Sequence, residues 1–167
     1  MRKVVIAFIC LVLAACGPRD TRPDSEKFAQ FHDQVTAIDK RVTAASDAYT
    51  RASDAAYDRK DRAALDKAAA DLHASLGAIR DDAAAVKPPE FASPDARDQA
   101  KQVLAALLAG IDANQDAAEA IRRTADPHHP TTPELAAIQD AKDRVSSAAL
   151  TETNAMFDLN ASLGGAK

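Results

Sequence analysis

Residues 28–56 have the sequence FAQFHDQVTAIDKRVTAASDAYTRASDAA, and this stretch decides the fold. Its apolar residues recur at alternating steps of three and four: Phe28, Phe31, Val35, Ile38, Val42, Ala45, Tyr49, Ala52 and Ala56. This spacing places them on one face of a helix, which then faces a partner helix along its whole length. The stretch therefore predicts one long helix of an all-α protein.

Three further stretches follow the same rule, each between recognisable start and stop signals. The second starts near Asp61, a candidate N-cap, and ends at Lys87-Pro88-Pro89. We expect its apolar face to hold Leu65, Ala69, Leu72, Leu76, Ile79, Ala83 and Val86. The third starts at Ser93-Pro94 and ends at residues 126–130. Its expected face holds Ala100, Leu104, Leu107, Ile111, Asn114, Ala118 and Ile121.

The fourth stretch starts at Thr132-Pro133-Glu134 and ends at Gly164-Gly165. Its expected apolar residues are Leu135, Ile138, Val145, Ala149, Met156 and Leu159. Lys142 and Glu152 stand where a strict heptad would place apolar residues. This break predicts that the fourth helix rotates to a 3.6-residue period and packs less tightly.

Short connections make consecutive helices antiparallel neighbours. Residues 24–163 are therefore expected to form an elongated up-down-up-down bundle of four helices, about 40–50 Å long. One alternative is a three-helix bundle with a loosely docked fourth helix. In another, the first two helices continue as one, because residues 58–61 contain neither proline nor glycine. The bundle topology places the residue-60 turn and the His128-His129 loop together, at the end away from the N-terminus.

The N-terminus carries a targeting signal. Arg2 and Lys3 precede an apolar run, residues 4–12, that is too short to span a bilayer, and Leu13-Ala14-Ala15-Cys16 follows. This quartet resembles the lipobox of bacterial lipoproteins. The resemblance implies that residues 1–15 are a removed signal peptide and that Cys16 carries the lipid, such as palmitate, that anchors the chain. An ordinary secretory signal or an uncleaved anchor is the alternative.

Residues 16–23 form the expected tether, in which the seven residues after Cys16 reach at most about 24 Å. Gly17, rather than aspartate, follows the cysteine. In the Gram-negative lipoproteins that this segment resembles, that choice implies sorting to the outer membrane. We therefore expect an outer-membrane anchor, with the bundle facing the periplasm.

Charge and cysteine content exclude several classes of function. Removing Arg2 and Lys3 leaves 19 of the 21 basic residues against 25 acidic ones, a net charge of −6. Nucleic-acid binding is disfavoured, because it needs clustered lysine and arginine. With Cys10 removed and Cys16 lipidated, no thiol remains for a disulfide, a zinc site or a nucleophile.

The histidines are weak candidates for metal ligands. His128 and His129 are adjacent in a loop bounded by prolines, but two ligands make a labile site, and a solvated loop is the favoured interpretation. In a hairpin that turns near residue 60, His32 and His73 lie about 21 Å apart along the axis and cannot share a metal. We expect no cofactor, although haem held by one histidine and Met156 stays an alternative.

Acidic pairs and one polar residue of the third helix complete the candidates. Asp81-Asp82 and residues 95–98 are interleaved with arginine and lysine, which is typical of a solvated surface. Asn114 is either a buried residue that sets the helix register or a half-exposed one. No residue is predicted to be catalytic, and we do not expect an enzyme.

The sequence thus predicts a lipid-anchored, non-catalytic helical bundle that acts as an interaction or structural module of the envelope. Its alanine-rich core buries little apolar area, which favours a protein partner or a homo-oligomer. The alternative is a periplasmic binding protein that holds a small ligand, metal or haem between its helices. That function needs a pocket with convergent polar groups, whereas an interaction module needs a filled core and an exposed apolar stripe.

Overall fold

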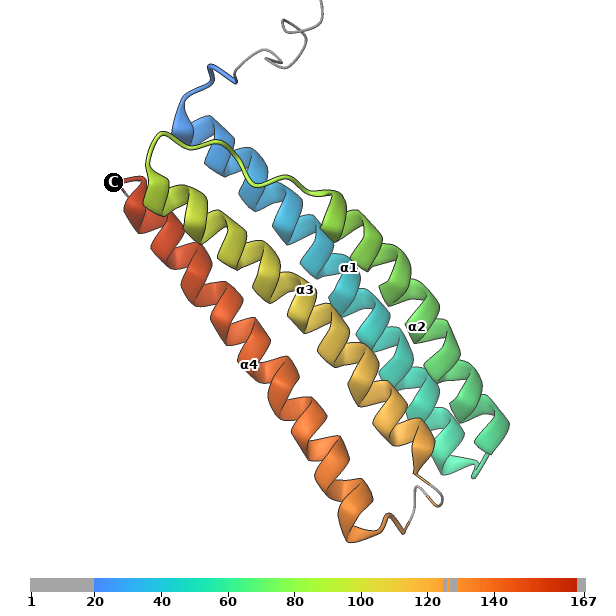
Figure 1. Ribbon diagram of the computed structural model, residues 1–167. Helices are drawn as coiled ribbons and strands as arrows, with labels where there is room; N and C mark the ends of the chain where they lie inside the picture. The colour runs from blue at the N-terminus through green and yellow to red at the C-terminus, as the bar shows by residue number, and fades with distance from the viewer. Residues whose placement is uncertain (1–19, 125, 127–128, 165–167) are drawn as a thin grey trace, which may run out of the picture.

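The computed structural model describes residues 20–124, 126 and 129–164, and this part of the chain contains four helices and no strand. The helices are α1 (Asp24–Asp58), α2 (Arg62–Ala85), α3 (Pro94–Arg123) and α4 (Thr132–Ser162). They run up, down, up and down along one long axis (Figure 1). The predicted all-α bundle is confirmed. The predicted signal peptide and Cys16 lie outside the described residues.

The turn between α1 and α2 is built from backbone hydrogen bonds. The Asp61 N–H donates to the Ala56 carbonyl at 2.9 Å, and the Lys60 N–H donates to the Tyr57 carbonyl at 2.9 Å. Lys60 takes a left-handed conformation with φ of 53°, as required at this position of a Schellman motif. The Asp61 carboxylate then accepts from the Ala64 N–H at 3.0 Å and caps α2. The alternative of one continuous helix is therefore wrong, whereas the Asp61 cap is confirmed.

The starts of α3 and α4 have the expected capping chemistry, although the N-cap of α4 lies one residue earlier than predicted. The Ser93 hydroxyl accepts from the Ala96 N–H at 3.4 Å, with Pro94 at the first helical position. At α4 the N-cap is Thr131, one residue before the predicted start. The Glu134 carboxylate accepts from the Thr131 N–H at 2.7 Å, which completes a capping box.

The core follows the predicted apolar faces of α1, α2 and α3. Six of the seven expected residues of α2 are buried, and Val86 is half-buried. Ala52 of α1 is exposed, so its predicted burial is wrong; the other predicted α1 residues are buried or half-buried. The largest fully buried side chains of the three helices are Phe31, Val35, Leu76, Val103 and Ile111. Phe91, from the connection between α2 and α3, is also buried and closes the core near the start of α1.

Helix α4 packs closely against α3, and that pair has the most extensive backbone contact in the bundle. A Cβ atom added to Gly110 would lie only 3.7 Å from the Ala148 Cβ, so small residues let the two backbones approach. The three-helix alternative is therefore wrong. Yet α4 buries only Ala141, Ala155 and Leu159, and the predicted burial of Leu135 and Ala149 is wrong, because both are exposed. The reason is that α4 has an extensive neighbour on one side only.

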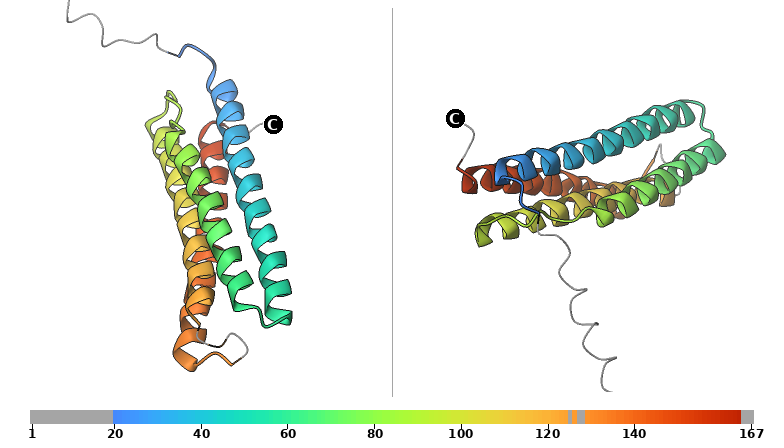
Figure 2. Two further views of the ribbon diagram at one scale, coloured as in Figure 1. Left: turned by 90° about the vertical axis from the view of Figure 1, so that its right-hand side faces the viewer. Right: turned by 90° about the horizontal axis from the view of Figure 1, so that it is seen from above.

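Hydrogen bonds fix the two ends of the bundle. Near the start of α1, the Lys27 ammonium donates to the Glu90 carbonyl at 3.0 Å, and the Asp24 carboxylate accepts from the Ala92 N–H at 3.0 Å. At the far end, Arg62 donates to the Thr124 carbonyl at 2.6 Å. The residue-60 turn and the end of α3 thus lie together, as predicted, and the C-terminal end of α4 lies beside the start of α1 (Figure 2). No helix in the described part of the chain has the length and apolar character needed to cross a bilayer.

Candidate functional site

A groove runs between α1 and α4. In a closed four-helix bundle these two helices would be neighbours, but in the described chain they have almost no backbone contact. Two adjoining cavities occupy the space between them, a central cavity of about 410 Å³ and a tether-side cavity of about 550 Å³. Together we call them the α1–α4 groove. Both are open to solvent and fall within the size range of small-molecule sites.

The central cavity has an apolar floor and polar walls. The floor comes from α3 and the inner faces of α1 and α4, and consists of Val42, Leu107, Ile111, Val145 and Ala149. The walls carry carboxyl, hydroxyl and amide groups from Asp39, Thr43, Ser46, Asp47, Asn114, Glu152 and Thr153. Polar groups from three helices therefore converge above an apolar surface.

The tether-side cavity lies nearer the start of α1 and has the same character. Its apolar side chains are Phe28, Val35, Met156 and Phe157, and Phe157 is 72% exposed. Its titratable residues are His32, Asp33, Asp39 and Glu152. Asp39 and Glu152 line both cavities, so they mark the point where the cavities meet.

Asp39 and Glu152 form a carboxyl pair that joins α1 to α4. Both are half-buried, and their side chains are within hydrogen-bonding reach of each other. Burial, the charge of Asp39 and this hydrogen bond together raise the pKa of Glu152 to about 8, and burial also raises the pKa of Asp39. At neutral pH the pair therefore holds one proton between its two carboxyl groups.

Asn114, in the wall of the central cavity, connects α3 to α1. Its side-chain oxygen accepts from the Ser46 hydroxyl at 3.2 Å, and its side-chain nitrogen donates to the Gly110 carbonyl at 2.9 Å. Asn114 is half-buried, which agrees with the half-exposed alternative rather than with a fully buried residue. About one turn after Ser46 on α1, the Tyr49 hydroxyl is buried without a hydrogen-bond partner among the described residues. Burial is the main cause that raises its pKa to about 12.

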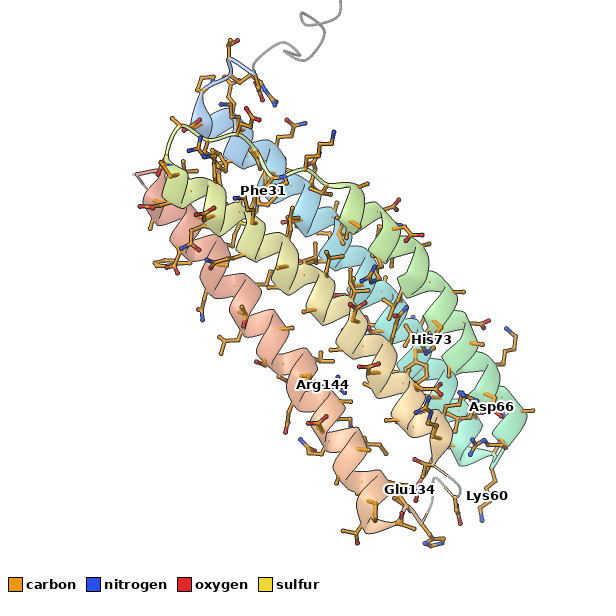
Figure 3. The ribbon with its side chains drawn as sticks, in the orientation of Figure 1. Phe31, Lys60, Asp66, His73, Glu134 and Arg144 are labelled. Atoms are coloured by element: carbon orange, nitrogen blue, oxygen red, sulfur yellow. The ribbon has the colours of Figure 1, made fainter. Side chains whose placement is uncertain are left out.

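The described histidines lie on three different elements, α1, α2 and the loop after α3. His129 is exposed in the loop after α3, and its backbone N–H donates to the Asp126 carbonyl at 3.0 Å. His128 lies outside the described residues. His32 lies against Phe28, with ring centroids 5.9 Å apart, whereas His73 lies 4.0 Å from the Glu119 carboxylate nearer the far end (Figure 3). The described residues contain no group of three metal-ligating side chains.

The acidic pairs that the sequence offered lie on solvated surfaces, as interpreted. Asp81, Asp82, Asp95 and Asp98 are all exposed. Asp82 pairs with Arg41 at 2.8 Å, and Asp98 pairs with Lys101 at 2.8 Å, which lowers the pKa of Asp98. These exposed acids differ from Asp39 and Glu152, which are half-buried and have each other as partners.

The carboxyl pair of the groove was not predicted from the sequence. Glu152 was noticed only as a break in the heptad, and Asp39 stands beside the apolar residue Ile38. The signal that could have found them is the combination of a carboxylate at an inward position of α4 with one at the edge of the apolar face of α1, in antiparallel register. Comparison of the chain with protein-family models, curated proteins and solved structures finds no match.

Proposed function

We propose that this protein is a lipid-anchored, non-catalytic bundle of the bacterial envelope that binds a partner in the α1–α4 groove. One observation carries the binding role: the fourth side of the bundle is open, and polar walls from three helices stand there above an apolar floor. A closed bundle would bury such a surface between α1 and α4. Grooves that combine an apolar floor with polar walls are sites at which partner helices and small ligands bind.

The anchor is supported by the sequence. The lipobox resemblance assigns the lipid to Cys16, and Gly17 favours the outer membrane, with the bundle in the periplasm. Because α1 begins at Asp24, the short tether would hold the start of α1 near the bilayer. The groove would then extend away from the membrane, with its tether-side cavity closest to it.

A non-catalytic role agrees with the chemistry of the groove walls. The Ser46 hydroxyl donates to the Asn114 amide, and the Thr153 hydroxyl donates to the Ala149 carbonyl at 2.9 Å. Neither hydroxyl is hydrogen-bonded to a base that would activate it as a nucleophile. The carboxyl pair retains a proton, but general acid–base work also requires a positioned reacting group.

Site-specific photo-crosslinking in the native envelope tests the binding role. A photoreactive residue at Thr153, in the groove wall, is expected to give a discrete adduct. The same residue at Ser75, exposed on α2, is the control and should not give that adduct. Filling the groove with Ala149→Trp should remove the Thr153 adduct, whereas Ala74→Trp on α2 should preserve it. Identical adducts from Thr153 and Ser75 would contradict a role for the groove.

The anchor has a separate test. Cys16→Ser should give an unprocessed precursor that acquires no lipid, whereas mass spectrometry of the wild-type protein should find acyl chains on Cys16. A wild-type protein unmodified at Cys16 would contradict the proposed location and leave the groove unaffected.

A small-ligand carrier is the second candidate function, favoured by the cavity volumes of about 410 and 550 Å³ and by the polar groups that converge on the central cavity. It predicts that a defined small molecule copurifies with the protein from its native envelope. That molecule should be absent from Ala149→Trp and present in Ala74→Trp.

A further inference from the structure

The charge of the α1–α4 groove has a single sign. Its four acidic residues are Asp33, Asp39, Asp47 and Glu152, and no lysine or arginine lines either cavity in the described chain. Several acids elsewhere on the helix faces have arginine partners, as in the pairs Arg80 with Asp112 at 2.7 Å and Arg144 with Asp116 at 2.8 Å. The groove therefore combines uncompensated acids with an apolar floor, and its complement is a cation carried on an apolar body.

The two cavities are spaced like residues two turns apart on a helix. Their lining residues on α4 run from 145 to 153 and from 152 to 160, so the cavity centres are about seven residues, or ~10 Å, apart along α4. On α1 the lining extends from residue 28 to residue 47, a length of about 28 Å. A helix of about 18 residues matches that length, and two of its side chains seven positions apart reach the two cavities.

We propose that the α1–α4 groove binds a basic amphipathic helix of a partner protein, with one lysine or arginine side chain entering each cavity beside Asp39 and Glu152. This inference rests on the proposed function, because it names the partner chemistry of the same groove. A second copy of this chain is disfavoured as the occupant, since a symmetric pairing of the groove would set the same acids against each other.

The shared proton of the carboxyl pair makes the proposal sensitive to pH. A cation placed beside Asp39 and Glu152 stabilises their charged forms, so it expels the proton that the pair holds at neutral pH. The other titratable groups that line the two cavities are His32, Asp33 and Asp47 from α1, whereas the α3 residues of the lining carry no charge. Helix binding should therefore strengthen as the pH rises toward 8.5 and weaken as salt is added.

Defined synthetic peptides test the inference with the full chain in non-ionic detergent. The probe is a fluorescent helix of about 18 residues with a leucine stripe and two arginines seven positions apart at its edge. One control peptide has glutamine in place of both arginines, and another carries the arginines on the opposite face. Fluorescence anisotropy should give a Kd for the probe at least about tenfold below that of either control.

Matched variants locate the binding. Asp39→Asn with Glu152→Gln should raise the Kd of the probe about tenfold and remove its dependence on pH. Asp81→Asn with Asp95→Asn removes two exposed acids outside the groove and should change it less than about twofold. Circular dichroism checks that the helices persist. If the variant with Asp39→Asn and Glu152→Gln does not fold, Thr153→Lys is the second test. It supplies a cation from the groove wall and should raise the Kd of the probe by a similar factor.

Each result decides the proposal. Equal affinity of the arginine and glutamine peptides overturns it, as does a probe that binds the groove variant as tightly as the wild type. Binding of butylammonium as tight as that of the probe also overturns it, in favour of a small cation. All of these outcomes leave the photo-crosslinking result at Thr153 intact, so they separate the failure of this inference from the failure of the proposed function.

Discussion

Replacing Glu152 with glutamine should remove a pH dependence from the stability of the bundle. In the unfolded chain this carboxyl has the ordinary pKa of 4.5, whereas in the groove its pKa is about 8. Between these values the folded state binds more protons than the unfolded state, so the free energy of unfolding falls as the pH rises. Glutamine keeps the shape and the donor toward Asp39 without the ionisation.

The magnitude follows from the size of the pKa change and from the exposure of the site. A pKa shift from 4.5 to about 8 corresponds to a change of ~5 kcal/mol in the free energy of unfolding if water does not screen the charges. Because the pair is half-buried in an open groove, water screens its charges. We therefore expect the wild-type protein to lose about 1–2 kcal/mol between about pH 5 and pH 8.5, a change of ~3 °C in Tm for each kcal/mol.

Urea unfolding followed by far-ultraviolet circular dichroism measures this effect. At about pH 5 the wild type and Glu152→Gln should have nearly equal stability, and at about pH 8.5 the variant should be more stable by about 1–2 kcal/mol. Asp81→Asn, an exposed acid on α2, is the control and should follow the wild type at each pH. Glu119, whose pKa is lowered to about 2 by Arg122, contributes the opposite slope, but only below about pH 4.5. A wild-type stability that is flat or rising over this window would refute the proton-sharing pair.

Three further substitutions and one control variant test the packing and the turn by the same urea unfolding. Ile38→Ala should cost about 2–5 kcal/mol, because Ile38 is buried in the core, whereas Lys40→Ala on the exposed face should be tolerated; equal tolerance would contradict the placement of α1. Lys60→Gly should stabilise the protein by about 1 kcal/mol, because glycine accepts the left-handed backbone at this position, and a loss of stability would contradict the turn. Tyr49→Phe should raise the free energy of unfolding by about 1 kcal/mol by removing a buried hydroxyl without a partner, and a loss of similar size would reveal a hydrogen bond that this hydroxyl makes.

The sequence was sufficient to predict most of the fold. The apolar faces of α1, α2 and α3 were predictable because each packs against more than one neighbour, so nearly all of their periodic positions are buried or half-buried. The helix starts at Asp61 and Ser93 were predictable because capping is local chemistry. Periodicity failed at Leu135 and Ala149, since the spacing of apolar residues does not say how many neighbours a helix has.

The candidate site was harder to predict because it depends on the rotation of α4. Sequence reasoning noticed that Glu152 interrupts the heptad, but it could not tell whether the carboxyl would face solvent, the core or another helix. The pairing with Asp39 requires both the antiparallel register of α1 and α4 and the distance between them. Both quantities are set by how closely α4 packs on α3, through Gly110 and Ala148.

The carboxyl pair also explains why the groove stays open. Moving α4 toward α1 would bury apolar side chains such as Val42 and Val145, but it would also enclose Asp39 and Glu152 between them. Burying two carboxyl groups away from water costs more free energy than burying two uncharged polar groups. The proton that the two carboxyl groups share offsets only part of that cost. Small residues on α3 meanwhile hold α4 close on its other side. Two acids at facing positions thus oppose the closing of one side of an otherwise regular bundle, and this side is the surface on which we propose that a partner binds.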